Sequence, residues 1–114
     1  MREENKHAGS ILVICAYKPK PGKEAELLDV VKTHVAILQE CGLATKRTES
    51  VMKAANGTIV EVFEWASSAA IAEAHKHPRV LEMWGKFNDC SDPVPVGDLD
   101  EAKHIYSDFT PVNF

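Results

Sequence analysis

Hydrophobic and polar residues follow two kinds of spacing in the first third of the chain. Ser10–Lys18 is a continuous apolar and β-branched run, short enough for a strand and too uniform for a strand with one wet face. From Lys23 to Cys41 the apolar residues recur at helical spacing, and Gly42 stands where a helix would end. The pattern therefore predicts a central strand and then a helix of about five turns.

A β-hairpin is predicted next. Residues 43–54 alternate loosely, and Asn56-Gly57 is the strongest two-residue signal for a hairpin turn. Thr58–Trp65 is the returning strand. Its parity places four side chains on one face, namely Ile59, Glu61, Phe63 and Trp65.

The second half of the chain predicts two helical segments, a loop and a last strand. Ser67 or Ser68 can cap a helix over residues 69–74, and Pro78 suits the first turn of a new helical segment. Residues 88–98 are rich in Pro, Gly, Asp and Ser and predict a loop, whereas residues 104–112 alternate as a strand does.

The order of the predicted elements is β-α-β-β-α-β. This is the ferredoxin-like arrangement, an α+β fold with one antiparallel sheet and both helices on one of its faces. The first and third strands carry apolar residues at both parities, so the other face would expose apolar side chains. We therefore expect a second copy of the chain to cover that face.

Length and composition predict one domain over residues 10–114, preceded by a disordered tail at residues 1–9. The sequence has no apolar run near the roughly 20 residues of a membrane span and no secretory signal pattern. Its three cysteines lack a CxxC spacing and suit reduced thiols in the cytoplasm. A net charge of −4, with scattered Lys and Arg, argues against nucleic acid and anionic membranes as partners.

Histidines are the first candidate functional residues. His75 could act as a general base, because imidazole titrates near neutral pH; alternatively it packs beside Ile71 or reaches solvent. His77 lies two residues on and points about 200° away on a helix, so the two predict no shared metal ion. His34, on the first helix, is expected to be half exposed.

Aromatic and acidic residues are the other candidates. Trp65 and Trp84 could line a pocket for a flat substrate or simply fill the core, and Tyr17 could donate its O–H to a substrate oxygen. Glu61 falls in an apolar strand, where an unpaired carboxylate is costly. It is therefore either a base or the partner of a hairpin cation, for which the candidates are Lys46, Arg47 and Lys53.

The stretch from Glu61 to Pro78 resembles a family signature. A strand ending in Glu64-Trp65 runs into Ser67 and Ala70 and then into a helix bearing Ala74 and His75. With the Pro21-Gly22-Lys23 helix entry, it resembles the antibiotic biosynthesis monooxygenase (ABM) family of the dimeric α+β barrel superfamily, over about residues 10–90.

The resemblance implies a homodimeric, cofactor-independent monooxygenase of small aromatic or polyketide-like molecules. A base removes an acidic proton and the resulting anion reacts with O₂. His75 would be the base, and the substrate would contact Trp65, Tyr17, Glu61 and Trp84. The first strand lacks the Asn of the haem-degrading branch, so no haem is expected, and the resemblance implies no other cofactor. No metal is expected either, because the sequence has no HExxH, CxxC or facial-triad spacing.

Two other functions stay open from the sequence. One is a non-catalytic, small-ligand-binding or stress-related dimeric barrel, and the other is a small isomerase or lactone-processing enzyme of the same superfamily. A buried pair of titratable groups facing one cavity would favour an enzyme, whereas a cavity lined only by carbon would favour the binding protein.

Overall fold

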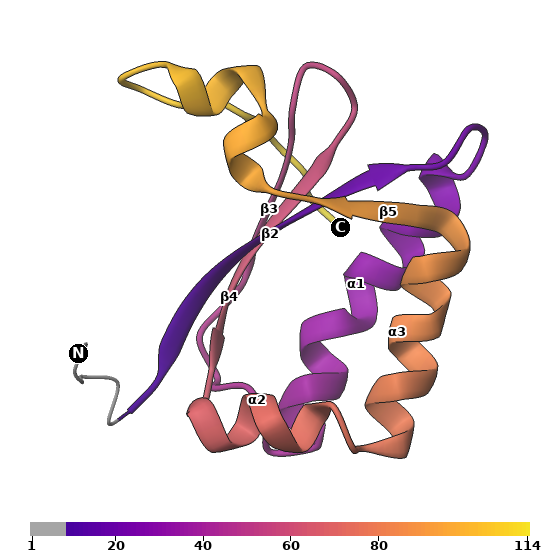
Figure 1. Cartoon of the computed structure of the whole chain (residues 1–114), viewed down its shortest axis with the longest axis vertical. Coiled ribbons are helices and arrows are strands. Elements are labelled where there is room, and N and C mark those ends of the chain that lie inside the picture. Colours follow the sequence, from indigo (N-terminus) through magenta and orange to yellow (C-terminus); the bar gives the residue numbers. More distant parts are fainter. Residues whose placement is uncertain (1–8) are drawn as a thin grey trace.

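The chain folds as one antiparallel sheet with helices packed on one of its faces (Figure 1). The computed structural model describes residues 9–114, so the predicted tail at residues 1–9 lies, except for Gly9, outside the described residues. The elements are β2 (Ile11–Pro19), α1 (Glu24–Glu40), β3 (Ser50–Lys53), β4 (Ile59–Trp65), α2 (Ser68–Ala74), α3 (Pro78–Cys90), β5 (Ser91–Val94), η1 (Val96–Asp98), η2 (Asp100–Lys103) and β6 (Thr110–Pro111).

The strand order β5-β2-β4-β3-β6 confirms the predicted ferredoxin-like α+β fold, with β6 added at one edge. All four strand pairings are antiparallel. Figure 1 shows α1 and α3 side by side on one face of this sheet. No helix within residues 9–114 is long and apolar enough to cross a membrane.

Local signals place most element ends where the sequence predicts them. Gly42 has φ +75° directly after α1, and Gly57 has φ +94° in the hairpin turn, a backbone conformation that favours glycine. The Ser67 hydroxyl accepts the Ala70 N–H at 3.0 Å as the cap of α2. Pro78 is the first residue of α3, as predicted.

The predicted last strand is wrong in position. Residues 104–109 are irregular, and only Thr110–Pro111 pairs with β3. The fourth strand of the ferredoxin-like order is instead β5, inside the segment predicted as a loop. β5 is an edge strand, so its backbone has a strand neighbour on one side only. Pro93, which has no backbone N–H, is therefore tolerated there.

The inner face of β4 confirms the predicted parity. Ile59, Glu61, Phe63 and Trp65 are all buried, and α1 and α3 pack over this face. Burial of a side chain such as Phe63 stabilises the fold by roughly 1.5–3 kcal/mol. One carboxylate therefore lies inside an otherwise apolar layer, and the helices must supply its partners.

The outer face of the sheet is covered over only part of its area. Ala16 and Val60 are buried there beneath Leu99 and Phe109 of the C-terminal segment, so the chain itself covers one part. Farther along β2 on the same face, Leu12 is 55% exposed and Ile14 is 56% exposed. The uncovered part is therefore apolar but smaller than the sequence predicts.

Candidate functional site

A cavity of about 510 Å³ lies between the inner face of the sheet and the helices. Its aromatic lining residues are Tyr17, Phe63, Trp65, Trp84 and Phe87. The lining also contains two histidines, but no Lys, Arg, Asp or Glu side chain among the described residues. An apolar cavity with a few polar groups is the usual form of a small-molecule site.

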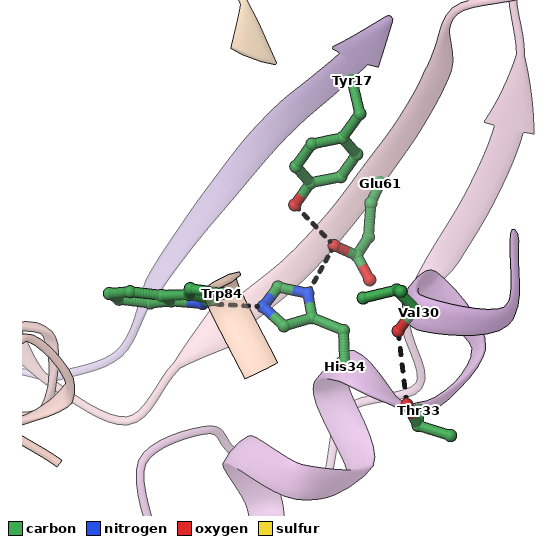
Figure 2. Close-up of polar contacts among 6 residues, drawn as sticks. All are labelled: Tyr17, Val30, Thr33, His34, Glu61 and Trp84. Atoms are coloured by element: carbon green, nitrogen blue, oxygen red, sulfur yellow. Dashed lines mark hydrogen bonds and ion pairs between the residues drawn. The ribbon is translucent and has the colours of Figure 1, made fainter. Parts of the chain in front are cut away.

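Four side chains form a hydrogen-bonded chain at this cavity (Figure 2). The Tyr17 hydroxyl donates to Glu61 Oε1 at 3.0 Å, and His34 Nδ1 lies 2.8 Å from the same oxygen. Trp84 Nε1 donates to His34 Nε2 at 3.4 Å. These hydrogen bonds thus join β2, β4, α1 and α3, and they connect a buried carboxylate to the cavity wall.

The hydrogen-bond partners determine which nitrogen of His34 carries its proton. An indole N–H can only donate, so Nε2 of His34 accepts from Trp84. The proton of a neutral imidazole is then on Nδ1, which donates to Glu61 Oε1. This is the tautomer of the neutral imidazole that both contacts favour, and the carboxylate fixes it.

Glu61 and His34 are both almost fully removed from solvent. Glu61 is 0% exposed and His34 is 3% exposed. Glu61 Oε1 accepts two hydrogen bonds, whereas Oε2 is buried without a hydrogen-bond partner among the described residues. A buried carboxylate with too few hydrogen bonds is costly. A proton added to His34 would therefore stabilise Glu61, because the imidazolium charge would compensate the carboxylate.

Aromatic packing fixes the orientation of these groups. The Tyr17 ring stacks on Phe87 with 4.6 Å between the ring centroids. The His34 ring meets Phe87 at 4.9 Å and Phe63 at 5.3 Å, edge to face in both cases. These contacts hold the imidazole in one plane, so its Nε2 has a defined direction.

Burial and the neighbouring carboxylate keep the Tyr17 phenol and the Cys15 thiol protonated. Burial is the larger cause that raises the pKa of the Tyr17 phenol, and the Glu61 charge raises it further. Burial likewise raises the pKa of the Cys15 thiol; a hydrogen bond with Tyr17 lowers it less strongly, and the Glu61 charge raises it. Tyr17 is therefore a hydrogen-bond donor at neutral pH.

His75 lies at the edge of the same cavity and is exposed. Its Nδ1 is 2.8 Å from the Ile71 carbonyl oxygen, which can only accept, so Nδ1 carries a proton and Nε2 is the nitrogen that has the lone pair in the neutral ring. The ring meets Trp84 edge to face at 5.1 Å. His75 thus bonds to Ile71, is exposed and also lines the cavity, and its role as a base stays a prediction.

The structure brings the sequence-predicted site residues together, with one difference in position. Tyr17, Trp65, Trp84 and His75 all line the cavity. Glu61 lies behind the wall and reaches the cavity through Tyr17 and His34.

Glu61 does not pair with a hairpin cation, so that alternative is wrong. Arg47 instead lies 3.3 Å from Glu64 on the outer face, and Lys53 lies 3.3 Å from Glu24. Glu64 is on the outer face of β4, so Arg47 lies on the wrong side for Glu61, whereas Lys53 shares the inner face but pairs with Glu24 of α1 instead.

His34 is the residue that the sequence interpretation misjudged. The expected half-exposed position is wrong, since His34 is buried against Glu61. A signal was present, because His34 follows Leu27 and Val31 at intervals of four and three residues and continues the apolar stripe of α1. A histidine in that stripe, facing a carboxylate in an apolar strand, indicates a buried pair.

Residues 9–114 contain no cluster of three His, Cys, Asp or Glu side chains arranged to hold a metal ion. A scan against protein-family models found no match, and a search of curated proteins found none either.

Among solved structures, the chain is similar to SnoaB, a cofactor-independent oxygenase from Streptomyces nogalater. The two superpose with a TM-score of 0.63 over 76% of this chain and 88% of SnoaB, with 15% identical residues. At this identity the likeness establishes the shared fold.

Proposed function

We propose that this protein is a cofactor-independent monooxygenase that acts on a small aromatic or polyketide-like molecule. The observation that carries the proposal is the buried Glu61–His34 pair at an aromatic cavity of about 510 Å³. Such a pair favours acid–base chemistry over simple apolar binding. The fold shared with SnoaB, a cofactor-independent oxygenase, supports the same class of reaction.

The proposed substrate carries an acidic CH₂ group beside an aromatic ring or a carbonyl. A base takes one proton, and the carbanion forms a C–O bond to O₂, giving a peroxide anion that is then protonated. Loss of the second proton from the same carbon breaks the O–O bond and expels hydroxide, which becomes water. One oxygen atom ends as a carbonyl, and all electrons come from the substrate.

His75 is the proposed base for the carbon-bound proton. In the neutral ring its Nε2 has a lone pair without a hydrogen-bond partner among the described residues, and the Ile71 carbonyl holds the ring by Nδ1. Trp65 and Trp84 are proposed to hold the flat substrate against the cavity wall. Because His75 is exposed at the edge, it can pass the proton to solvent.

Oxygen consumption tests the proposal directly. Purified protein is mixed with hydroxylated naphthalenes and anthracenones, and dissolved O₂ is followed with an electrode. We expect consumption of one O₂ per product carbonyl, and a loss of about 100-fold or more in His75→Gln, the usual effect of removing a general base. The control is His104→Gln, because His104 is exposed in the C-terminal segment, outside the cavity lining.

The outcomes separate this proposal from its alternatives. Substrate-class molecules that bind without O₂ consumption would overturn the oxygenase and favour the binding protein. Conversion of such a molecule without O₂ consumption would instead favour the isomerase. The mostly apolar lining of the cavity is the observation that keeps the binding function in the comparison.

The proposal includes a homodimer in the cytoplasm. Leu12 and Ile14 form an apolar patch on the outer face that the C-terminal segment leaves uncovered. Ile105 and Tyr106 of that segment are exposed as well, so a second copy related by a two-fold axis would have apolar groups to offer in return.

A further inference from the structure

We infer that His34 ionises a ring hydroxyl of the ligand, so that the cavity takes a hydroxylated aromatic molecule as its phenolate. The inference deepens the proposed function by naming the substrate class, and its reaction rests on that function. The binding itself does not, because it requires only His34, Glu61 and Trp84.

The lone pair of His34 Nε2 accepts only a long hydrogen bond in the structure. Its contact with Trp84 Nε1 is 3.4 Å, which is long beside the usual 2.9–3.0 Å for a donor nitrogen. His34 is one of the residues that line the cavity, and the inference places the ligand hydroxyl at Nε2, the ring nitrogen with the longer of the two hydrogen bonds. A phenolic O–H placed there would give Nε2 a shorter and stronger hydrogen bond than the indole does.

Proton transfer then needs no other reactant. The ligand O–H bond breaks, its proton moves to Nε2, and the electron pair stays on the phenolate oxygen. The imidazolium now donates from both nitrogens, from Nδ1 to Glu61 and from Nε2 to the ligand. Trp84 Nε1–H, released from Nε2, is close enough to donate to the same phenolate oxygen.

The charges around His34 favour this transfer. Glu61 holds Nδ1 at 2.8 Å and has an unpartnered buried oxygen, so an imidazolium compensates the carboxylate. Tyr17 and Cys15 face the same region as protonated groups, and His75 lies at the edge. Among the described residues the lining holds no Lys or Arg, so imidazolium is the cation available to a bound anion.

The ring of the ligand also has a defined place. Phe63 and Phe87 pack on His34 from two directions, and Trp84 lies beyond its Nε2. A ring that places its hydroxyl on Nε2 therefore meets aromatic walls. The geometry predicts selection for aromatic hydroxyl compounds over aliphatic acids, which lack a face to stack.

A coloured phenol tests the inference without any turnover. 4-Nitrophenol is titrated with the protein one pH unit below the solution pKa of the phenol, where about nine-tenths of the free compound is neutral. We expect the bound compound to show the visible absorption band of nitrophenolate. 4-Nitroanisole, which has the same shape but no acidic proton, should bind without any change in its band.

Variants assign the proton to His34. His34→Gln and Glu61→Gln should lower the ratio of phenolate to neutral phenol in the bound ligand at least about tenfold, the effect of one pKa unit. His104→Gln, outside the cavity lining, should keep the phenolate band. If the band survives in both His34→Gln and Glu61→Gln, or if the wild-type protein binds only the neutral phenol or none, the inference is wrong.

Imidazole ¹⁵N spectra of the wild-type protein give a test that does not depend on the folding of a variant. His34 should show one protonated nitrogen, Nδ1, in the free protein and two when 4-nitrophenol is bound. A His34 that stays singly protonated with ligand present would contradict the inference. Phenolate binding without O₂ consumption by any substrate would overturn the oxygenase alone, and O₂ consumption with a neutral bound phenol would overturn this inference alone.

Discussion

Glu61 Oε1 and His34 Nδ1 lie 2.8 Å apart, although one residue comes from β4 and the other from α1, 27 positions away. Both side chains are buried, so the contact forms only when the helix packs on the sheet. The same packing creates the cavity wall. The buried pair and the core of the fold therefore depend on one another, and substitutions of either residue should affect stability as well as the proposed chemistry.

Tyr17→Phe should destabilise the protein. The phenol donates to the buried Glu61 carboxylate at 3.0 Å, and hydrogen bonds to charged groups contribute about 1.5–3 kcal/mol. Urea unfolding should show a loss of about that size. Tyr106→Phe is the matched control, because Tyr106 is 82% exposed and its change should stay within about 0.5 kcal/mol. Equal losses in the two variants would contradict the assigned hydrogen bond.

Most of the fold could be predicted because its elements follow from local pattern. The apolar stripe of α1, the Asn56-Gly57 turn and Pro78 each act within a few residues. The fourth strand could not be read in this way. Ser91–Val94 contains Pro93 and has loop composition, and it is a strand because the edge of β2 offers it a partner.

The candidate site was predictable in its residue types but not in its pairing. The parity of β4 placed Glu61 inside, and the need for a partner followed from burial. Which residue supplied that partner depended on the rotation of α1 against the sheet, a tertiary relationship between distant segments. His34 was therefore identified only when the helix and the strand were seen together.

Ligand in the cavity should protect Cys15 from alkylation. The thiol lines the cavity, and burial raises its pKa, so little reactive thiolate is present near pH 8. At about ten times its Kd, 4-nitrophenol leaves about one-tenth of the sites open and should slow iodoacetamide labelling roughly tenfold.

Peptide mass spectrometry measures that labelling, with Cys41 as the control within the same molecule. Cys41 caps the C-terminal end of α1, outside the cavity lining, so its rate should not respond to ligand. Equal slowing of both cysteines would indicate a general effect of the ligand and count against a filled cavity.

Glu64 should contribute to acid sensitivity. The Thr45 hydroxyl at 2.7 Å is the main cause that lowers the pKa of Glu64, followed by Ser10, and Arg47 also lowers it. A lowered folded pKa gives stability that is present above the ordinary value of about 4.5 and is lost as the pH falls through the folded pKa. Glu64→Gln should therefore lose less stability than the wild type between pH 7 and pH 3.

Titration of Glu64 by NMR isolates the cause. Thr45→Val should raise the pKa of Glu64 toward its ordinary value, because the strongest hydrogen bond to the carboxylate is gone. Thr33→Val is the matched control, since the Thr33 hydroxyl bonds only the Val30 carbonyl on α1 among the described residues. A pKa of Glu64 that does not move in Thr45→Val would show that the hydroxyl is not its cause.

Ile14→Lys should convert the proposed dimer to a monomer. Ile14 is 56% exposed on the uncovered part of the outer face, and a two-fold interface contains the same residue twice. One substitution therefore adds two like charges to an apolar contact, and like charges placed together across an interface cost several kcal/mol. Sedimentation velocity should show a dimer for the wild type and a monomer for Ile14→Lys.

Leu81→Lys is the control for this prediction. Leu81 is also exposed and apolar, but it belongs to α3 on the helical side of the sheet, so this variant should remain dimeric. A wild-type monomer, or dissociation by both variants alike, would leave the outer face without its proposed partner.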